Sequence, residues 1–288
     1  MRSSDAAPEP GRPVRTAVVG HVEWVRFARV DRVPPAGGIA HATDGWEGAG
    51  GGGGVAAAQL AALAGGALLF TAFGDDEVGG RAGDDLRRRG VDVHAATRAG
   101  PTRTALTMID AAGERTIVTL GDRLEPRADD PLPWDVLAGV DGVYVTAGDD
   151  GALRRARAAR VVVVTSRISD RLASSGIAAD VVVGSAHDPA ERYDPEALPV
   201  PPGLVVRTEG AAGGSWHAAD GRRGRYEATP APGPVVDTYG AGDSFQAGLT
   251  FGLAAGLEVE GALALAARCG AHAVTGRGPA GGLLRLGP

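Results

Sequence analysis

Runs of valine alternate with helical segments through the middle of the chain. The apolar runs span residues 143–146, 161–165, 180–183 and 204–207, and the helical patterns between them span 151–159 and 169–176. A strand that is apolar on both sides must be covered on both faces of its sheet, and helices that connect parallel strands provide that cover. The pattern therefore predicts an α/β fold, a doubly wound, mostly parallel sheet flanked by helices. The chain has 288 residues, 44% of them hydrophobic, so it can bury a core of that size.

The flanking parts of the chain continue this alternation. We expect a strand at 16–19, a helix at 56–63, a strand at 68–73, a helix that ends at the stop glycine Gly90, and a last helix at about 258–274. Residues 1–13 include three prolines and a glycine, a composition typical of a disordered leader. The remaining residues, 14–288, are predicted to form a single domain.

Two segments depart from the alternation, at about 22–47 and 103–120. In both, apolar and polar residues alternate over short stretches separated by turn residues, which indicates β-strands and no helix. Residues 104–110 and 115–120, joined by Ala112 and Gly113, are a good hairpin candidate. We expect the two segments to form a small β lid that covers the ends of the parallel strands and excludes water.

The stretch from Asp237 to Asp243 reads Asp-Thr-Tyr-Gly-Ala-Gly-Asp and precedes a helical pattern that is apolar at positions 245, 249 and 253. Gly240 and Gly242 let the backbone turn at the start of this helix, where free amides and the helix dipole favour an anion. Asp243, in the first turn, is placed to accept a proton from a hydroxyl group. Together these groups predict phosphoryl transfer. Taken alone, Asp243 has a second explanation, that of a capping residue.

Composition excludes several other kinds of site. The chain contains no Lys and no Asn, so neither a lysine-dependent phosphate loop nor a Schiff-base lysine exists. The single cysteine, Cys269, excludes an internal disulfide and a cysteine-rich metal site. The net charge of −6 argues against a nucleic-acid partner. No apolar stretch reaches membrane-spanning length and no signal segment is evident, so we expect a cytoplasmic protein without a membrane partner.

The chain resembles the ribokinase family, the PfkB-type carbohydrate kinases, from Val18 to Gly278. Residues 237–243 are similar to the family's D-T-x-G-A-G-D signature at every defined position, and the glycine run at 50–54 is similar to the diglycine that opens a helix in the first signature. Gly74, Asp76 and Gly79 resemble its G-x-D-x-x-G segment. The resemblance implies a ribokinase-like fold and a single kinase domain with a β lid.

The resemblance also implies roles for individual residues. Asp243 would be the base that activates a substrate hydroxyl, and the amides of Gly240, Ala241 and Gly242 would form the anion hole. The implied nucleotide-binding residues are Thr208, Gly210, Gly213, Thr238, Thr275 and Gly278. The implied substrate-binding residues are Glu23, Gly51, Gly52, Val55, Arg103 and Asp243. Asp188 is the implied metal ligand, ATP with Mg²⁺ the donor, and a monovalent cation such as K⁺ a further candidate.

Several positions depart from the family pattern. The Asn expected on the helix after the diglycine is replaced in the region of Val55 and Ala56, and the early substrate carboxylate falls on Val25, with Glu23 the nearest acid. The N-x-x-E segment reads Ser-Ala-His-Asp at 185–188. A buried polar group left without its partner costs about 1 to 3 kcal/mol, so these changes predict an altered acceptor. The sequence therefore predicts an ATP-dependent phosphotransferase acting on a hydroxyl of a sugar or sugar-like molecule.

Other interpretations remain at this stage. One is a non-catalytic binding protein on a kinase fold, and another is a nucleoside kinase. A dinucleotide-binding enzyme is a third, because Gly48, Gly50 and Gly53 satisfy G-x-G-x-x-G, although no apolar strand directly precedes them. Arg103 and Arg115 on the lid are candidates for contacts with a phosphate or carboxylate. A homodimer through the lid is a further hypothesis, because a small sheet exposes an apolar face and two edges.

Overall fold

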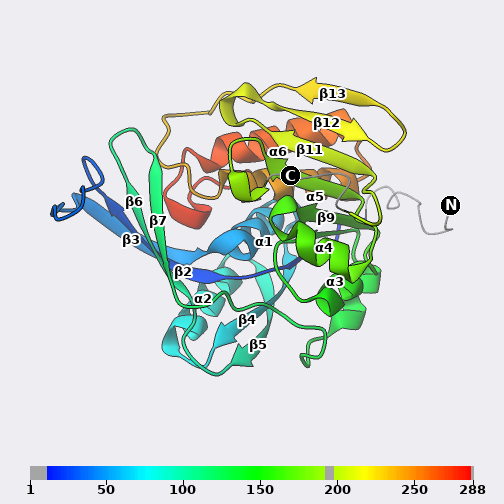
Figure 1. Cartoon of the computed structure of the whole chain (residues 1–288), viewed down its shortest axis with the longest axis horizontal. Coiled ribbons are helices and arrows are strands. Elements are labelled where there is room, and N and C mark those ends of the chain that lie inside the picture. The colour runs from blue at the N-terminus through cyan, green and yellow to red at the C-terminus, as the bar shows by residue number, and fades with distance from the viewer. Residues whose placement is uncertain (1–11, 192–197, 287–288) are drawn as a thin grey trace.

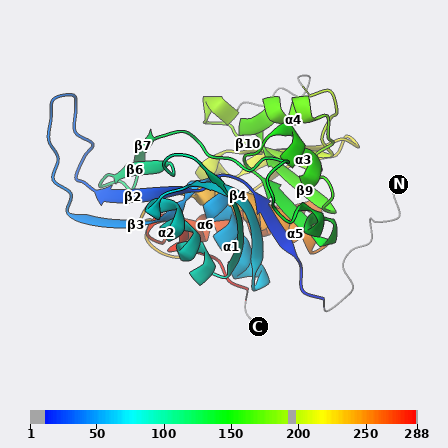
Figure 2. The same cartoon turned by 90° about the horizontal axis from the view of Figure 1, so that it is seen from below.

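The computed structural model describes residues 12–191 and 198–286. Positions 1–11 of the predicted leader lie outside these residues. Within the described ranges the strands form two sheets, one of nine strands and one of four. Figures 1 and 2 show the larger sheet and its helices as the body of the molecule, with the smaller sheet projecting from one side. The smaller sheet, made of β2, β3, β6 and β7, is called the lid sheet below.

The nine-stranded sheet has the order β13-β12-β11-β10-β9-β8-β1-β4-β5. Its strands are β1 (Thr16–Val19), β4 (Ala67–Gly74), β5 (Val91–Arg98), β8 (Gly142–Val145), β9 (Val161–Thr165), β10 (Val181–Ser185), β11 (Leu204–Thr208), β12 (Gly214–Ala218) and β13 (Arg223–Tyr226). All neighbours from β5 to β11 are parallel, whereas β12 and β13 are antiparallel additions at one edge. The expected mostly parallel sheet is confirmed.

Helices cover both faces of this sheet. They are α1 (Gly51–Ala64), α2 (Glu77–Arg88), α3 (Asp150–Ala156), α4 (Ser169–Ser175), α5 (Ala241–Ala254) and α6 (Val259–Ala273), with 3₁₀ turns at Trp134–Gly139, Ser166–Ile168, Pro189–Glu191, Gly210–Ala212 and Gly278–Ala280. Helix α3 ends at Ala156, earlier than expected, and the guanidinium of Arg157 donates to the carbonyls of Ala159 and Arg160 in the turn that follows. In the described part of the chain no helix has the length and apolar character to span a membrane.

Two apolar cores result from the alternation of side chains along the parallel strands. One core joins residues such as Val18, Tyr144 and Val163 to α1, α2, α5 and α6. The other joins residues such as Val143 and Val162 to α3, α4 and the Trp134–Gly139 turn. Strands with both faces buried explain the continuous valine runs, and the fold is doubly wound as expected.

Strand β1 is the point at which the sheet is extended in two directions. After β1 the chain adds β4 and β5 on one side, and it then adds β8 and β9 on the other side. In open α/β sheets, ligands bind at the carboxyl ends of the strands beside such a switch point. A ligand-binding site is therefore expected at the residues that directly follow β1 and β8.

The lid sheet has the order β3-β2-β6-β7, from β2 (Glu23–Arg29), β3 (Asp44–Gly50), β6 (Thr104–Ile109) and β7 (Arg115–Leu120). The pairs β2–β3 and β6–β7 are antiparallel, and the two hairpins meet through a parallel pair between β2 and β6. Its inner face packs Val25, Phe27 and Ile109 against Val55 and Tyr239 of the body. Strand β3 runs to Gly50, three residues beyond the segment expected from sequence, and α1 follows at once.

Helices α5 and α6 pack unusually closely through small residues. A methyl group at Gly248 would lie 2.7 Å from Sγ of Cys269 and 2.9 Å from Cα of Ala266, and one at Gly252 would lie 2.9 Å from Cα of Ala262. The two helices therefore meet almost backbone to backbone, behind the turn that starts α5.

Candidate active site

The turn that leads into α5 is fixed by one buried carboxylate. Asp237 has no exposed surface, its Oδ1 accepts the N–H of Tyr239 at 2.8 Å, and its Oδ2 accepts the N–H of Gly278 at 2.7 Å. Gly240 then adopts a φ of 76°, and a methyl group there would lie 2.9 Å from the side chain of Val55. Only glycine fits both restrictions. The position of the start of α5 is thus set from two sides.

The N-terminus of α5 is uncapped. Gly240 occupies the N-cap position, and no side chain of the described residues accepts a hydrogen bond there. The amides of Ala241 and Gly242 in the first turn therefore have no partner within the helix. Because the helix dipole adds positive potential at the same point, this turn is a ready site for a phosphate group.

Asp243 lies in that first turn with its carboxylate turned toward the glycine run of α1. A methyl group at Gly52 would lie 3.0 Å from Oδ1 of Asp243. Burial, and next the negative charge of Glu191, raise the pKa of Asp243 to about 6, while Arg115 and Arg167 oppose the rise. The carboxylate is therefore ionised at neutral pH and more basic than an ordinary Asp. It does not cap α5, so the capping explanation does not fit this geometry.

The glycine run at the start of α1 lets three elements approach the base. Gly51, with a φ of 75°, donates its N–H to the hydroxyl of Tyr239 at 2.9 Å. That hydroxyl in turn lies 3.5 Å from Oε1 of Glu23. A methyl group at Gly52 would also lie 2.6 Å from Oγ1 of Thr146. The structure thus brings Glu23, Gly51 and Gly52 together beside Asp243; their role in substrate binding stays a prediction.

Val55 does not join them at the surface of the site. Its side chain is 1% exposed and packs with Val25, Phe27 and Tyr239 beneath the turn. A side chain so enclosed does not meet a ligand, and its role here is to support Gly240. Val25, at the position of the family's early carboxylate, is fully buried in the same core.

Two residues at the switch point were missed in the sequence. His21 follows β1 and Thr146 follows β8, and both are more than nine-tenths buried. Burial, and next the charges of Arg123, Arg103 and Arg167, lower the pKa of His21 to about 3, so its imidazole is neutral. The only sequence signal for either residue is its place directly after an apolar strand.

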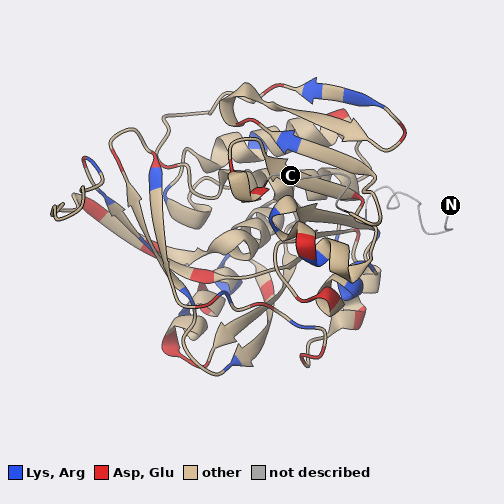
Figure 3. Cartoon of the chain, viewed as in Figure 1, with Lys and Arg blue, Asp and Glu red and all other residues tan. Residues whose placement is uncertain are grey.

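The lid sheet contributes arginines to the same region. Nε of Arg103 lies 3.4 Å from Oε2 of Glu23, and Arg115 donates to the carbonyl of Thr238 at 2.7 Å. Figure 3 shows charged residues of both signs where the lid sheet meets the body. The sequence did not decide whether Arg115 binds a ligand; in the structure its guanidinium joins β7 to the turn that precedes Asp243.

The family's G-x-D-x-x-G segment has a structural task. Asp76 accepts hydrogen bonds from the N–H of Gly79 at 3.0 Å and from the N–H and hydroxyl of Thr102 at 3.0 and 2.6 Å. A methyl group at Gly74 would collide with the backbone of residues 100–102. Because Thr102 precedes Arg103, this segment fixes the point where the chain enters the lid sheet.

The residues assigned to nucleotide binding fall into two groups. Thr238 belongs to the Asp237 turn, and Gly278 is bound to it through Asp237, while the hydroxyl of Thr275 donates to the carbonyl of His272 at the end of α6. Thr208, Gly210 and Gly213 lie where β11 turns into β12, at the carboxyl edge of the sheet. Asp237 thus joins Gly278 to the turn that contains Thr238.

Two acids lie on the segment after β10. Asp188 and Glu191 both bind the guanidinium of Arg167, at 2.5 and 2.8 Å, and Oε2 of Glu191 also accepts the N–H of Ser185 at 2.9 Å. Glu191 acts on the pKa of Asp243, whereas Asp188 is the more exposed. Among the residues that the structure describes, no group of three or more His, Cys, Asp or Glu is placed to hold a metal by itself.

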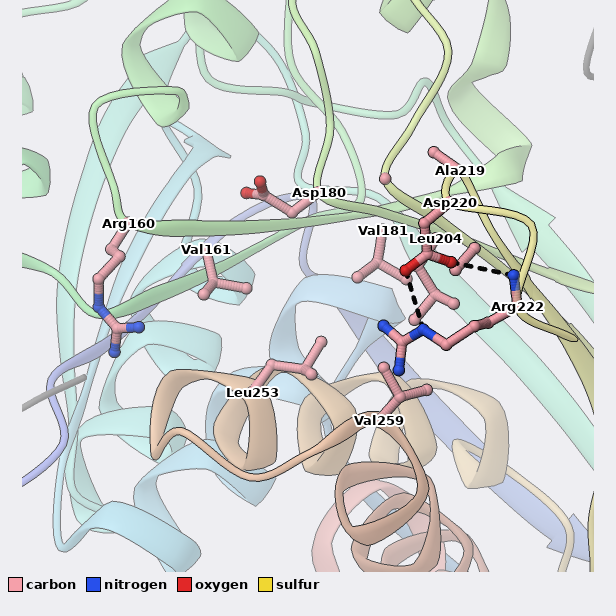
Figure 4. A pocket seen from close by; sticks show the side chains of 12 residues that line it. Arg160, Val161, Asp180, Val181, Leu204, Ala219, Asp220, Arg222, Leu253 and Val259 are labelled. Atoms are coloured by element: carbon pink, nitrogen blue, oxygen red, sulfur yellow. Dashed lines mark hydrogen bonds and ion pairs between the residues drawn. The ribbon is translucent and has the colours of Figure 1, made fainter. Parts of the chain in front are cut away.

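A surface hollow lies at the opposite edge of the sheet. It measures about 480 Å³ and lies at the amino ends of β9, β10 and β11. Figure 4 shows Arg160, Asp180 and Arg222 around it, with Arg222 bound to Asp220 at 2.8 Å. The chemistry described above is at the carboxyl ends of the strands, so this hollow is not the reaction site.

Comparison with known proteins places this site in a family. The family model of the pfkB family carbohydrate kinases matches residues 15–155 and 179–284. An ATP-dependent ribose-1-phosphate kinase of Halopiger xanaduensis is 32% identical over 274 residues, which cover 90% of this chain and 91% of that protein.

Solved structures agree with this match at the level of the fold. A ribokinase candidate of Agrobacterium tumefaciens is 24% identical, covers 95% of both chains and has a TM-score of 0.78. The adenosine kinase of Sinorhizobium meliloti is also 24% identical, covers 93% of this chain and 96% of its own, and has a TM-score of 0.74. The fold is ribokinase-like, and the chain belongs to the PfkB family of carbohydrate kinases.

Proposed function

We propose that this protein transfers the terminal phosphoryl group of ATP to a hydroxyl of a sugar or sugar-like molecule, with Asp243 as the base. One observation carries the assignment of the base. A basic, buried carboxylate stands between an uncapped helix N-terminus and the open side of Gly52. An acceptor hydroxyl between them would meet a proton acceptor and anion-binding amides at once.

The roles of the chain's own groups follow from this arrangement. Asp243 takes the proton from the acceptor hydroxyl as its oxygen attacks phosphorus. The amides of Ala241 and Gly242 donate to the oxygens of the phosphoryl group, where negative charge is greatest during transfer. The lid sheet, whose inner face packs on Tyr239 and Val55 beside this turn, is the element we expect to exclude water from it.

We further propose that Mg²⁺ binds with the phosphates of ATP next to Asp188 and Glu191. Mg²⁺ keeps several waters and needs only one or two carboxylates besides phosphate oxygens. This fits a site with two acids on one segment, since the described residues contain no larger metal-binding cluster. Chelation with EDTA should abolish transfer and added Mg²⁺ should restore it. Asp188→Asn should raise the Mg²⁺ concentration needed for half-maximal rate; an unchanged requirement would remove Asp188 from this role.

A requirement for a monovalent cation such as K⁺ stays a prediction. Replacing K⁺ by tetramethylammonium in the assay buffer tests it directly.

The test of the function is a screen for acceptor-dependent ADP formation from ATP. Neutral sugars, sugar phosphates and adenosine form the panel, because the Halopiger relative is named for ribose 1-phosphate and a structural neighbour for adenosine. Turnover with a sugar or sugar phosphate supports the proposal, and turnover restricted to adenosine would favour the nucleoside kinase. Acceptor binding without ADP formation in any combination would favour a non-catalytic binding protein.

The dinucleotide-binding alternative is not favoured by the structure. Gly48 and Gly50 belong to β3 of the lid sheet and not to a turn after a strand of the parallel sheet. The geometry that the G-x-G-x-x-G pattern requires is therefore missing.

We also propose a homodimer through the lid sheet. The side of this sheet that faces away from Tyr239 carries Leu106, Val118 and Leu120, which are 41, 49 and 59% exposed. β3 and β7 are unpaired edges within the described residues. Sedimentation should show a dimer that Val118→Glu converts to a monomer, with the exposed Val136→Glu, which lies outside the lid sheet, as control. A wild-type monomer at assay concentration would exclude this interface.

A further inference from the structure

The side chain of Tyr239 joins two parts of the site that lie far apart in the sequence. Tyr239 belongs to the turn before Asp243, and its hydroxyl accepts the N–H of Gly51 at 2.9 Å. The same hydroxyl lies 3.5 Å from Oε1 of Glu23, at the start of β2. One side chain of the turn therefore contacts both the start of α1 and the carboxylate assigned to the acceptor.

The hydroxyl of Tyr239 is oriented by the hydrogen bond that it accepts. Because Gly51 donates to its oxygen, the hydroxyl proton points to another acceptor. Glu23 provides that acceptor, since its Oε1 lies next to the hydroxyl. Burial, and next the charge of Glu23, raise the pKa of Tyr239 well above its ordinary value, so the proton stays on the hydroxyl. Tyr239 therefore donates toward Glu23 and orients its carboxylate.

The protein holds the carboxylate of Glu23 only loosely. Glu23 is 7% exposed, and its oxygens lie 3.5 Å from the hydroxyl of Tyr239 and 3.4 Å from Nε of Arg103. Hydrogen bonds to a carboxylate are ordinarily shorter, at about 2.7 to 2.9 Å. Burial raises the pKa of Glu23, while the charge of Arg103 opposes the rise. The carboxylate therefore has capacity left to accept a hydrogen bond from a hydroxyl of the acceptor.

The hydroxyl of Tyr239 also lies beside the position of the family's early carboxylate. A methyl group at Gly50 would lie 2.5 Å from this hydroxyl and 2.7 Å from Cγ2 of Val25. Val25 is fully buried and apolar, so it offers the acceptor no hydrogen bond. Phe27 meets the ring of Tyr239 edge-on, at 5.1 Å between ring centroids, and fixes its direction. The turn before α5 thus supplies a polar group where β2 has lost one.

We propose that Tyr239 determines acceptor specificity, because its hydroxyl positions Glu23 to accept a hydrogen bond from a ring hydroxyl of the acceptor. Through Gly51 the same hydroxyl is tied to the glycine run beside Asp243. Tyr239 occupies the undefined position of the D-T-x-G-A-G-D signature, so it can serve the acceptor while its neighbours serve transfer. It is a positioning residue, since it acts through Glu23. The inference rests on the proposed function and adds a residue to it.

The experiment compares acceptor binding and turnover in Tyr239→Phe, which removes the hydroxyl and keeps the ring. Calorimetric titration without nucleotide uses ribose, ribose 1-phosphate and adenosine as probes, because they offer ring hydroxyls with different substituents. The dissociation constant of each probe that binds the wild type should rise about threefold to thirtyfold. The acceptor KM should rise by a similar factor, whereas kcat and the KM for ATP should stay within about threefold.

Tyr226→Phe is the matched control. Tyr226 also carries a buried hydroxyl, which has no hydrogen-bond partner among the described residues, and its ring packs on Phe245 at 5.5 Å between centroids. The same atom is thus removed from β13, away from the contact with Glu23. The control should leave acceptor binding unchanged, and thermal unfolding should show that both variants fold.

A double-mutant cycle with Glu23→Met tests whether Tyr239 acts through Glu23. Met keeps the length of the side chain and removes the carboxylate. Alone, this change should weaken probe binding about tenfold to a hundredfold. Adding Tyr239→Phe should then weaken binding by less than about twofold more, because the group that Tyr239 positions is gone. A hydroxyl with only a structural role would lower binding by the same factor in both backgrounds.

The outcomes separate this inference from the proposed function. If Tyr239→Phe and Tyr226→Phe behave alike, or if the two losses in the cycle multiply, Tyr239 does not position Glu23 while the kinase assignment stands. A fall in kcat with an unchanged acceptor KM also overturns the inference and would place the hydroxyl in the transfer step. Binding of none of the three probes by the wild type counts against a Glu23 that binds ring hydroxyls. Coupled losses of binding in a protein that forms no ADP keep Tyr239 in this role and contradict the kinase.

Discussion

An aspartate stands at each end of the Asp237–Asp243 turn, but the two side chains differ in their hydrogen bonding. Asp237 is fully buried, and each of its oxygens accepts a backbone N–H, from Tyr239 and Gly278. Asp243, six residues later, has no such partner, and burial raises its pKa to about 6. Both oxygens of Asp237 are engaged in hydrogen bonds that hold the turn, whereas the carboxylate of Asp243 is available to accept a proton. The two residues are of the same type, and they differ in whether backbone N–H groups bind their carboxylates.

Asp243→Asn should give the largest effect and the sharpest contrast. Loss of a general base lowers kcat about 10²-fold to 10⁴-fold. Because the folded pKa lies above the ordinary value of 3.8, ionisation at neutral pH opposes folding, so the Asn variant should be more stable by about 3 kcal/mol. Steady-state kinetics and denaturant unfolding measure the two changes. Normal turnover in the variant would contradict the assignment of the base.

Gly52→Ala tests whether the free carboxylate depends on an open space beside it. The new methyl group would lie 2.6 Å from Oγ1 of Thr146 and 3.0 Å from Oδ1 of Asp243, so it must displace the base. We expect about a 10²-fold loss of kcat/KM. The matched change at the other end, Gly278→Ala, strains a φ of 64° and meets the ring of Trp46, so it should act mainly on thermal stability. Equal losses of kcat/KM in Gly52→Ala and Gly278→Ala would contradict the separate roles given to Asp243 and Asp237.

The pH dependence should report Asp243 alone. Below pH 6, log kcat/KM should fall by about one per pH unit as the base is protonated, and above pH 7 it should be level. Stability should move the other way: the advantage of Asp243→Asn over wild type is full above about pH 6 and disappears as the pH falls toward 4. Titrations of activity and of unfolding free energy over pH 4–8 check both. A base that titrates near 4 would mean that its burial has no kinetic consequence.

Asp237→Asn should give the smallest kinetic effect and a loss of stability. An amide in this place retains one acceptor and points an NH₂ group at a backbone N–H. Since burial already raises the pKa of Asp237, removal of the charge offsets part of the loss, and we expect a net cost of about 1 to 3 kcal/mol. Chemical denaturation measures it, with kcat expected to stay within about tenfold of wild type. A variant that is stable but inactive would make Asp237 part of the chemistry.

The sequence was sufficient for the sheet and for the turn, because both are local patterns. Valine runs specify strands buried on both faces, and the seven residues from Asp237 to Asp243 contain the whole turn. The lid hairpins were also predictable, but not the parallel pair between β2 and β6, whose strands lie about 80 residues apart. Nothing in a local pattern specifies such a pairing.

The parts of the site that were missed depend on the fold. His21 and Thr146 are ordinary polar residues until β1 and β8 become neighbours at the switch point. Arg167 looks like a solvated charge in the sequence, and only the folded chain pairs it with Asp188 and Glu191. The assignment of Asp188 followed the spacing of the family segment, whereas Glu191, three residues on, is the acid whose charge reaches Asp243.

The close contact of α5 with α6 has a consequence for how such a protein can change. With Gly248 and Gly252 against Cys269, Ala266 and Ala262, the helix that presents the amides and Asp243 cannot slide or tilt without a steric clash. The lid sheet, by contrast, meets the body through the contacts of Val25, Phe27 and Ile109 with Val55 and Tyr239. Any change of shape around the site is therefore expected in the lid sheet, while the first turn of α5 keeps its position against α6.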